Sequence, residues 1–230
     1  GSCATEMQSK LTAYETLLSF GTDRTDEERS DEEVTEWLRF YFNRVIRVIG
    51  ANIIDPYAVL DGEIIAANPW EGDSDYDYES TQWYQKAMEN DGGPAFTDVY
   101  TDVIQERSII TISQRSESGD AVLAFDIFPE NLKFDFESIS LPEGGSYFLF
   151  DSKGKIIFEQ SETGDYVFKE ENFNNLFESI KKGEHDTYDS SIKDAAGKTH
   201  GVYYVAMPNG WYSVVTIPYA SILQNVEQFF

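Results

Sequence analysis

The 230-residue sequence contains one cysteine and two histidines, which leaves little for disulfide or metal chemistry. Cys3 has no partner for an intramolecular disulfide and cannot by itself form a cysteine-based zinc site. His185 and His200 lack the spacing of metal ligands, and the sequence has neither a glycine-rich phosphate loop nor a nucleophile elbow. We therefore expect no metal, no cofactor and no enzymatic activity.

Positive charge is also scarce, with 17 Lys and Arg residues against 42 Asp and Glu residues and a net charge of −25. A surface this acidic repels nucleic-acid phosphates and anionic lipid headgroups, so we expect neither as a partner. The acidity also favours solubility by itself. No apolar run reaches the roughly 18 to 20 residues of a membrane helix. The sequence is therefore predicted to be soluble. It could also be the water-exposed segment between two membrane spans of a longer protein.

What the sequence does have is a core-forming share of apolar residues, 41% hydrophobic and 15% aromatic. Its length suits one large domain or two small ones. Apolar residues recur at helical spacing over 6–20. A polar break over 21–29 follows, and Ser30 with Glu33 forms a capping box that predicts a second helix ending at Gly50.

The pattern then changes to that of an antiparallel sheet. Strands over 57–60 and 63–66 flank Asp61-Gly62, a strong signal for a hairpin turn. The remaining elements predicted for this first unit are a loop over 68–79, a helix over 81–89, strands over 108–113 and 121–127, and a return to helix over 129–136.

A second unit begins near Gly144. A strand, an Asp/Gly turn and an Ile-Ile strand recur over 146–158, which indicates a duplicated sheet module. The elements predicted after this hairpin are a helix over 173–181, strands over 187–193, 201–206 and 211–217, and a terminal helix over 219–230. The predicted fold class is therefore α+β, with a long N-terminal helix before two antiparallel-sheet modules.

The segment most suggestive of a binding site lies between the two hairpins. Trp83 and Tyr84 begin the short helix, Tyr100-Thr101-Asp102 follows, and an apolar strand ends in Asp126. Aromatic rings and carboxylates together suit a small polar ligand, because a carboxylate pairs with an ammonium group and a ring face attracts a cation.

Each of these residues also has a plain structural interpretation. Trp83 and Tyr84 on an amphipathic helix often serve only as core. Asp102 suits a turn or a helix cap. Asp126 either is buried, and then needs a partner, or lies on the solvent face of its strand.

In their order, these motifs resemble the double Cache family, the extracytoplasmic sensor domains of bacterial receptors. The first module of that family carries Arg-x-Trp-Tyr on a helix, a Tyr-x-Asp step and a strand ending in Asp. These motifs correspond here to 81–84, 100–102 and Phe125-Asp126. The hairpin of the second module and its closing Gly-Trp and Ile-Pro pairs correspond to 150–157, Gly210-Trp211 and Ile217-Pro218.

The resemblance implies two PAS-like modules and a division of the chain. The predicted segments are a helical stalk over 1–50, a membrane-distal ligand-binding module over 51–140, a membrane-proximal module over 141–218, and a helix toward a membrane span over 219–230. The resemblance also implies a location outside the cytoplasm, in a membrane-anchored chemoreceptor or histidine kinase whose output domain lies beyond this chain. A homodimer through the N-terminal helix is a further expectation.

The resemblance also assigns the site. Asp102 and Asp126 correspond to the residues that hold the ligand amine in the family, where aromatic side chains surround the site. The predicted ligand-binding residues are Tyr76, Thr81, Trp83, Tyr84, Tyr100, Asp102 and Asp126.

One position departs from the family pattern. Amino-acid-binding members carry an Arg two residues before the Trp, where it holds the ligand carboxylate, and this sequence has Thr81 there. A threonine hydroxyl cannot replace such a bidentate, charged clamp. We therefore favour an amine without an α-carboxylate as the ligand. The alternative is an amino acid whose clamp comes from Arg107 or Arg115.

A rival hypothesis is a surface binding or adhesion module without signalling output, anchored by a lipid at Cys3. The Gly1-Ser2 that precedes it is also a common cloning remnant, the interpretation we favour. Terminal helices that continue into membrane spans would exclude the adhesion hypothesis.

Overall fold

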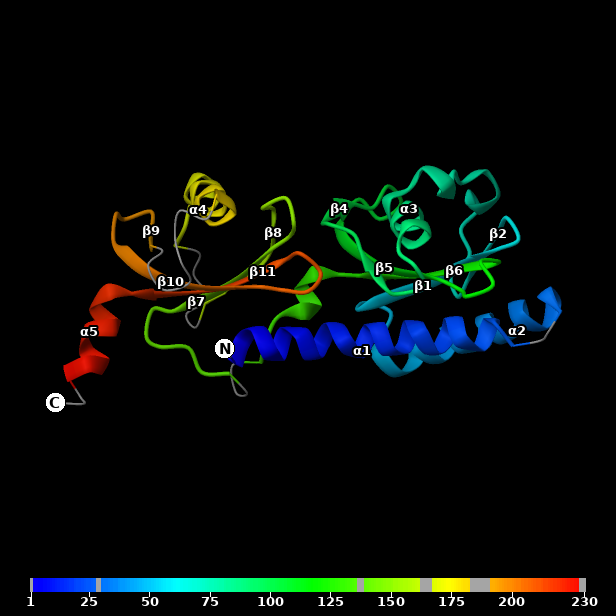
Figure 1. Ribbon diagram of the computed structural model, residues 1–230, viewed down its shortest axis with the longest axis horizontal. Helices are drawn as coiled ribbons and strands as arrows, with labels where there is room; N and C mark the ends of the chain where they lie inside the picture. Colours follow the sequence, from blue (N-terminus) through cyan, green and yellow to red (C-terminus); the bar gives the residue numbers. More distant parts are fainter. Residues whose placement is uncertain (1, 28–29, 136–138, 162–166, 183–190, 228–230) are drawn as a thin grey trace. The chain divides into compact units, whose positions relative to one another are not determined.

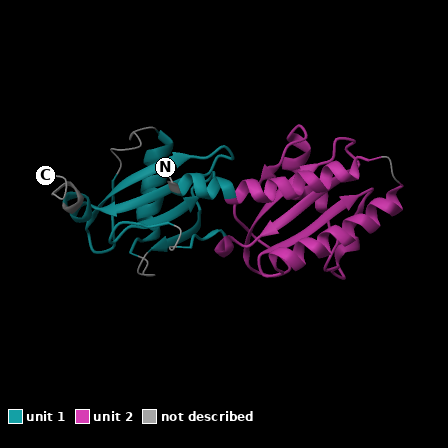
Figure 2. Ribbon diagram, turned by 90° about the horizontal axis from the view of Figure 1, so that it is seen from below, with its two compact units in different colours: residues 1–9, 132–230 teal, residues 10–131 magenta. Residues whose placement is uncertain are grey.

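The computed structural model describes residues 2–27, 30–135, 139–161, 167–182 and 191–227 (Figure 1). Contacts divide the chain into two compact units, one of residues 10–131 and one of residues 1–9 with 132–230 (Figure 2). Most of the segment predicted as a separate stalk therefore belongs to the same unit as the first sheet. No helix in the described part of the chain is both long and apolar enough to cross a bilayer.

Two helices, α1 (Ser2–Thr25) and α2 (Asp31–Ile49), open the chain. As predicted, the Ser30 side chain caps α2 by accepting the Glu33 N–H. The Tyr41 hydroxyl of α2 donates to the Leu17 carbonyl of α1 at 2.5 Å. This bond and ring contacts between the helices join them into a helical hairpin (Figure 1).

The prediction that the first helix ends at Phe20 was wrong, because α1 continues through Gly21 to Thr25. Gly21 is buried, and a Cβ there would lie 2.6 Å from the side chain of Leu123. The glycine is therefore needed for close packing of the helix rather than for a turn. Within the last turn, the Thr25 hydroxyl donates back to the Thr22 carbonyl.

The first unit contains one antiparallel sheet in the order β2-β1-β6-β5-β3, with β4 also paired to β5. Its strands are β1 (Ile54–Leu60), β2 (Glu63–Ala66), β3 (Ala95–Phe96), β4 (Tyr100–Thr101), β5 (Ser108–Arg115) and β6 (Ala121–Ile127). The predicted hairpin is confirmed: Leu60 pairs with Glu63, and Asp61 and Gly62 both have positive φ, at 52° and 82°. Two such residues in succession are what a type I′ turn requires.

Helix α3 (Gln82–Glu89) lies on one face of this sheet, with the short helices η1 (Asp73–Asp75) and η2 (Tyr78–Ser80) before it. Trp83 is 1% exposed and packs with Val122 and Ala124 of β6. The Ser113 hydroxyl of β5 donates to the Trp83 carbonyl at 2.6 Å. Since side chains alternate along a strand, Asp126 belongs to the same face as Val122 and Ala124, beneath α3.

The second unit repeats the plan with a sheet in the order β8-β7-β11-β10-β9. Its elements are β7 (Ser146–Phe150), β8 (Ile156–Ser161), α4 (Glu170–Lys182), β9 (Ser191–Lys193), β10 (Thr199–Ala206), β11 (Tyr212–Pro218) and α5 (Tyr219–Glu227). The predicted hairpin over 146–158 is confirmed. Of the strand predicted over 187–193, residues 187–190 lie outside the described residues. The helix predicted over 129–136 shrinks to the 3₁₀ turn η3 (Pro129–Leu132).

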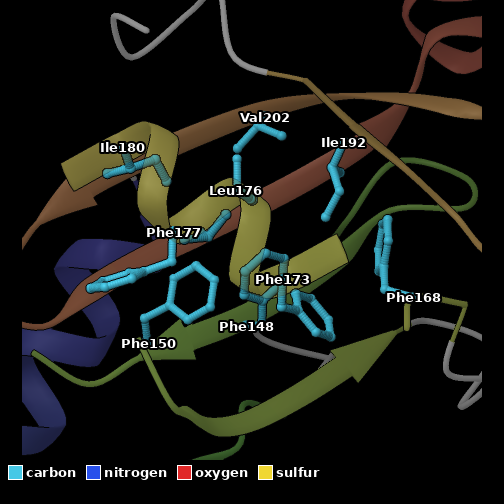
Figure 3. Close-up of a cluster of buried hydrophobic side chains, with 10 residues drawn as sticks. Phe148, Phe150, Phe168, Phe173, Leu176, Phe177, Ile180, Ile192 and Val202 are labelled. Atoms are coloured by element: carbon cyan, nitrogen blue, oxygen red, sulfur yellow. The ribbon is translucent and has the colours of Figure 1, made fainter. Parts of the chain in front are cut away.

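Phenylalanine rings fill the space between α4 and its sheet (Figure 3). Phe173 of α4 lies 4.8 Å from Phe148 between ring centroids, and Phe177 lies 5.4 Å from Phe150, both edge-on. Edge-to-face pairs at these distances are favourable and leave little free volume. In this unit, the face beneath the helix is therefore a packed core.

Candidate functional site

The first unit encloses a cavity of about 640 Å³. Its walls come from β1 and β2, the loop over 68–80, the start of α3, the loop over 100–105 and the end of β6. The corresponding face of the sheet in the second unit is covered by phenylalanine side chains. A volume of this size suits a small molecule.

Six of the seven predicted site residues line this cavity. They are Tyr76, Thr81, Trp83, Tyr100, Asp102 and Asp126. The seventh, Tyr84, is not among the lining residues, and its ring instead packs edge-on against Tyr78 and Trp83 at 5.1 and 5.9 Å. Tyr84 therefore supports the cavity wall indirectly, by packing against Trp83.

Asp126 lies at the floor of the cavity and is 9% exposed, which rules out the solvent-face interpretation. Its Oδ1 accepts hydrogen bonds from the Tyr57 hydroxyl and the Thr111 hydroxyl, each at 2.7 Å. The Thr111 hydroxyl has one proton and donates it to Asp126. In the 2.5 Å contact between the Tyr100 and Thr111 hydroxyl groups, Tyr100 must therefore be the donor. A chain of donors thus points toward one carboxylate oxygen.

Asp55 is a site residue that sequence reasoning missed, as is Thr111. Asp55 lines the cavity from β1, and in the strand register it pairs directly with Asp126 of β6. Thr111 of β5 is the partner of Asp126 on the other side. Directly opposed residues have Cβ atoms about 5 Å apart, so the two carboxyl groups share one region of the floor.

Burial raises the pKa of both floor carboxyl groups. The pKa of Asp126 rises to about 8, chiefly because the group is desolvated. Hydrogen bonds from Thr111 and Tyr57 oppose this shift, and the nearby Asp55 and Asp102 add to it. The pKa of Asp55 rises to about 6 through burial and then through repulsion by Asp102 and Asp73. A pKa near 8 keeps the Asp126 carboxyl group mostly protonated at neutral pH.

Tyrosine hydroxyls complete the floor. Burial raises the pKa of Tyr57, Tyr76 and Tyr100 above the ordinary value, and the Asp126 carboxylate adds to each shift. All three hydroxyls therefore stay protonated at neutral pH. Trp83 donates its indole N–H to the Tyr76 oxygen at 3.5 Å. The walls next to the carboxyl groups are thus aromatic, with hydroxyl groups at their edges.

Asp102 also has the turn role that its sequence context suggests. Its carboxylate accepts the backbone N–H of Ile104 at 3.3 Å and of Gln105 at 3.1 Å. Asp73, in the loop before α3, accepts the N–H of Trp70 at 3.0 Å. Both acids therefore line the cavity while bonding to the loops that carry them.

Basic side chains are absent from the residues that line the cavity, within the part of the chain that the structure describes. Arg107 pairs with Glu130 and lies over the Phe128 ring, 3.6 Å from its centroid. Arg115 faces Asp91 at 3.7 Å. Neither arginine reaches the cavity wall, so the alternative carboxylate clamp has no support in the structure.

Thr81 has a structural task of its own. Its hydroxyl oxygen accepts the Tyr84 N–H at 3.3 Å as the N-cap of α3 and donates to the Tyr78 carbonyl at 2.6 Å. The hydroxyl group is therefore engaged with the backbone on both sides.

Of the two histidines, the structure describes His200, and it does not line this cavity. His200 is buried in the second unit, where its Nε2 lies 3.0 Å from Asp194 Oδ2. His185 falls outside the described residues. Among the described residues, no group of three or more His, Cys, Asp or Glu side chains is arranged to hold a metal ion.

Comparison with known proteins begins with a family model. Residues 25–128 match the model described as methyl-accepting chemotaxis protein-like, first PDC sensor domain. This range contains every residue of the cavity discussed above.

Two curated relatives come from Bacillus subtilis strain 168. Methyl-accepting chemotaxis protein TlpA is 24% identical over 84% of this chain and 29% of its own length. McpC is 27% identical over 60% of this chain and 20% of its own. The chain thus spans less than a third of either relative.

Solved structures share the fold over almost the whole chain. The ligand-binding domain of Campylobacter jejuni chemoreceptor Tlp3, in complex with L-valine, has a TM-score of 0.70 at 18% identity, covering 96% of this chain and 90% of that one. The ligand-binding domain of Pseudomonas fluorescens chemoreceptor CtaA, in complex with L-isoleucine, has a TM-score of 0.68 at 16% identity. The match covers 97% of this chain and 90% of that one. The chain therefore has the double PAS-like fold of these ligand-binding domains, and its residues 25–128 are similar to the first PDC sensor domain of methyl-accepting chemotaxis proteins.

Proposed function

We propose that this chain is the extracytoplasmic sensor domain of a bacterial transmembrane receptor and that its cavity binds a small molecule through an ammonium group. The observation that carries the proposal is the opposition of Asp55 and Asp126 in a cavity whose described lining has no basic side chain. Two carboxylates held this close repel each other unless a proton or a cation lies between them. A primary ammonium supplies one positive charge and three donors.

The walls suit such a group. Trp83, Tyr57 and Tyr100 surround the floor, and the faces of aromatic rings attract cations while excluding water. Exclusion of water strengthens the attraction between ammonium and carboxylate. The donor chain through Thr111 holds Asp126 in place, so little order is lost on binding.

Related domains support a ligand of this class. The Tlp3 and CtaA domains were solved with L-valine, L-isoleucine and L-alanine, each of which carries an ammonium group. Those ligands also carry a carboxylate, which here would face an acidic lining without an arginine. We therefore propose an amine that lacks an α-carboxylate as the preferred ligand, with amino acids binding more weakly.

The domain would signal by binding rather than by catalysis. A ligand shifts a receptor between two states only if it binds one state better than the other. Ionised Asp55 and Asp126 favour a cavity closed around a cation, whereas in the empty cavity a proton on Asp126 relieves their repulsion. The output domain and a homodimer through the N-terminal helix are parts of the proposal that concern the longer receptor.

A thermal-shift screen against primary amines, amino acids and carboxylates tests the proposal. An amine at 100 times its Kd should stabilise the fold by about 2.7 kcal/mol. Asp126→Asn should abolish that shift while keeping the acceptor for Tyr57 and Thr111. Asp120→Asn, which removes an exposed charge outside the cavity, is the matched control. Stabilisation by carboxylates alone, or by amines equally in Asp126→Asn, would refute the assignment.

A further inference from the structure

Three apolar side chains line the cavity and are nevertheless exposed. Trp70 is 45% exposed, Val103 79% and Ile104 48%, whereas Trp83 at the floor is 1% exposed. Single exposed apolar residues are ordinary. Three exposed apolar side chains in the lining of one cavity are less ordinary, because exposed apolar surface that gathers at one site is typical of a binding surface. We call Trp70, Val103 and Ile104 the rim.

The rim comes from two loops, and an aspartate fixes each one. Asp73 accepts the backbone N–H of Trp70. Asp102 accepts the N–H groups of Ile104 and Gln105 through its carboxylate, and its own carbonyl accepts the Glu106 N–H at 2.9 Å. The rim residues are therefore attached to backbone that is already ordered before a ligand arrives.

The indole of Trp70 is also placed by packing. A Cβ built on Gly72 would lie 2.2 Å from two atoms of the Trp70 ring, so the ring covers the backbone at this glycine. Gly72 has φ −85°, which any residue can adopt. A side chain at this position would therefore displace the ring without straining the backbone.

The lining of the cavity thus combines buried carboxyl groups at its floor with the exposed apolar side chains of the rim. We propose that the rim selects amines that carry an alkyl group, by burying that group once the ammonium has reached Asp126. Asp73 and Asp102 are positioning residues that hold the two halves of the rim. This inference rests on the proposed function, and it adds a specificity that the floor alone cannot supply.

A series of unbranched primary amines from ethylamine to hexylamine tests the inference by titration calorimetry. Each methylene that the rim covers should tighten binding about fourfold. Trp70→Ala should flatten this dependence on chain length while leaving the affinity for ethylamine within about twofold. Gly72→Ala should also flatten the dependence on chain length, because the added methyl group displaces the Trp70 ring while every rim side chain is kept. Val48→Ala, which truncates an exposed apolar residue outside the cavity, should keep the full dependence.

The positioning role has its own readout. Asp102→Ala should flatten the chain-length dependence, and Asp102→Asn should restore it, because the amide oxygen can still accept the two backbone N–H groups. Equal loss of ethylamine affinity in both variants would instead make Asp102 a direct ammonium ligand.

Failure of the inference and failure of the proposed function give different results. If no amine of any length binds, the proposed function is wrong. If all amines bind with one affinity, or if the dependence survives in Trp70→Ala and in Val103→Ala/Ile104→Ala, the floor assignment stands and the rim is refuted.

Discussion

Asp55 and Asp126 are directly opposed on the antiparallel strands β1 and β6. Like charges in such a pair destabilise a sheet. The structure reduces this cost with hydroxyl donors on Asp126 and with carboxyl groups whose pKa values are raised to about 6 and about 8. The first sheet thus keeps an unfavourable pair at the position where a cation would relieve it.

The pH dependence of stability should reveal this pair. Between pH 4 and pH 8 the folded protein keeps a proton on Asp126 that the unfolded chain has released, so the free energy of unfolding falls as pH rises. The slope from this one group reaches about 1.4 kcal/mol per pH unit. Asp126→Asn should remove that part of the slope. Urea unfolding at several pH values measures it, and identical slopes for the two proteins would contradict the raised pKa.

Amine affinity should depend on pH in the opposite sense. The ammonium binds ionised Asp126, so binding below pH 8 must release its proton, and the affinity should rise by up to tenfold per pH unit from pH 6 to pH 8. The amine itself stays charged in this range. Titrations in phosphate measure the effect, because amine buffers would compete for the site. An affinity that does not change with pH would place the ammonium away from Asp126.

Thr81 should matter for stability more than for amine binding. Loss of its hydroxyl in Thr81→Ala removes the N-cap of α3 and should cost about 1 kcal/mol of unfolding free energy. Thr81→Ser keeps the cap and should lie close to the original protein. Thermal unfolding of the three proteins compares them. A large loss of amine affinity in Thr81→Ala at temperatures where it is folded would show direct contact with the ligand.

Two turns of the second unit form a matched pair for measuring the packing of α4. In each turn an aspartate, Asp151 or Asp194, accepts two backbone N–H groups through Oδ1, and a glycine at positive φ follows three residues later. A Cβ on Gly154 would lie 2.3 Å from the Phe177 ring, whereas one on Gly197 has no described neighbour within 4 Å.

Alanine at these two glycines should therefore have unequal effects. Gly197→Ala should cost about 1 kcal/mol, the strain of a left-handed residue. Gly154→Ala adds a clash with the ring and should cost roughly 1 to 3 kcal/mol more. Denaturant unfolding gives both values. Equal losses would mean that Phe177 moves aside freely and that the phenylalanine core is less tightly packed than the structure indicates.

Local signals in the sequence were enough to predict most of the fold. Asp61-Gly62, the Ser30 capping box and the alternating strands each specify their own geometry, and each is found where it was expected. The end of α1 was missed, because Gly21 serves the packing of Leu123, a residue far away in the sequence. A distant contact of this kind leaves no local signal.

The site was predictable only where residues carry a motif. Asp55 was missed because it precedes Pro56, which lacks the N–H of a strand residue, so the predicted strand began at Tyr57. Its role depends on pairing with Asp126 across 71 positions of sequence, which is a property of the register. Thr111 was missed for the same reason. The sequence could not decide whether Asp102 is a turn residue or a site residue. In the structure it is both, because it lines the cavity and accepts hydrogen bonds from its own loop.

The hydroxyl of Thr81 links ligand choice to the integrity of a helix. An arginine at this position would offer a grip for carboxylates and would give up the side-chain oxygen that starts α3. Under the proposed function, Thr81→Arg would therefore exchange local stability for a group that can hold a carboxylate. Compensation would have to come from another acceptor for the backbone N–H groups at the start of α3. Under the proposed function, the residue at position 81 thus affects both which ligand the cavity accepts and whether α3 forms.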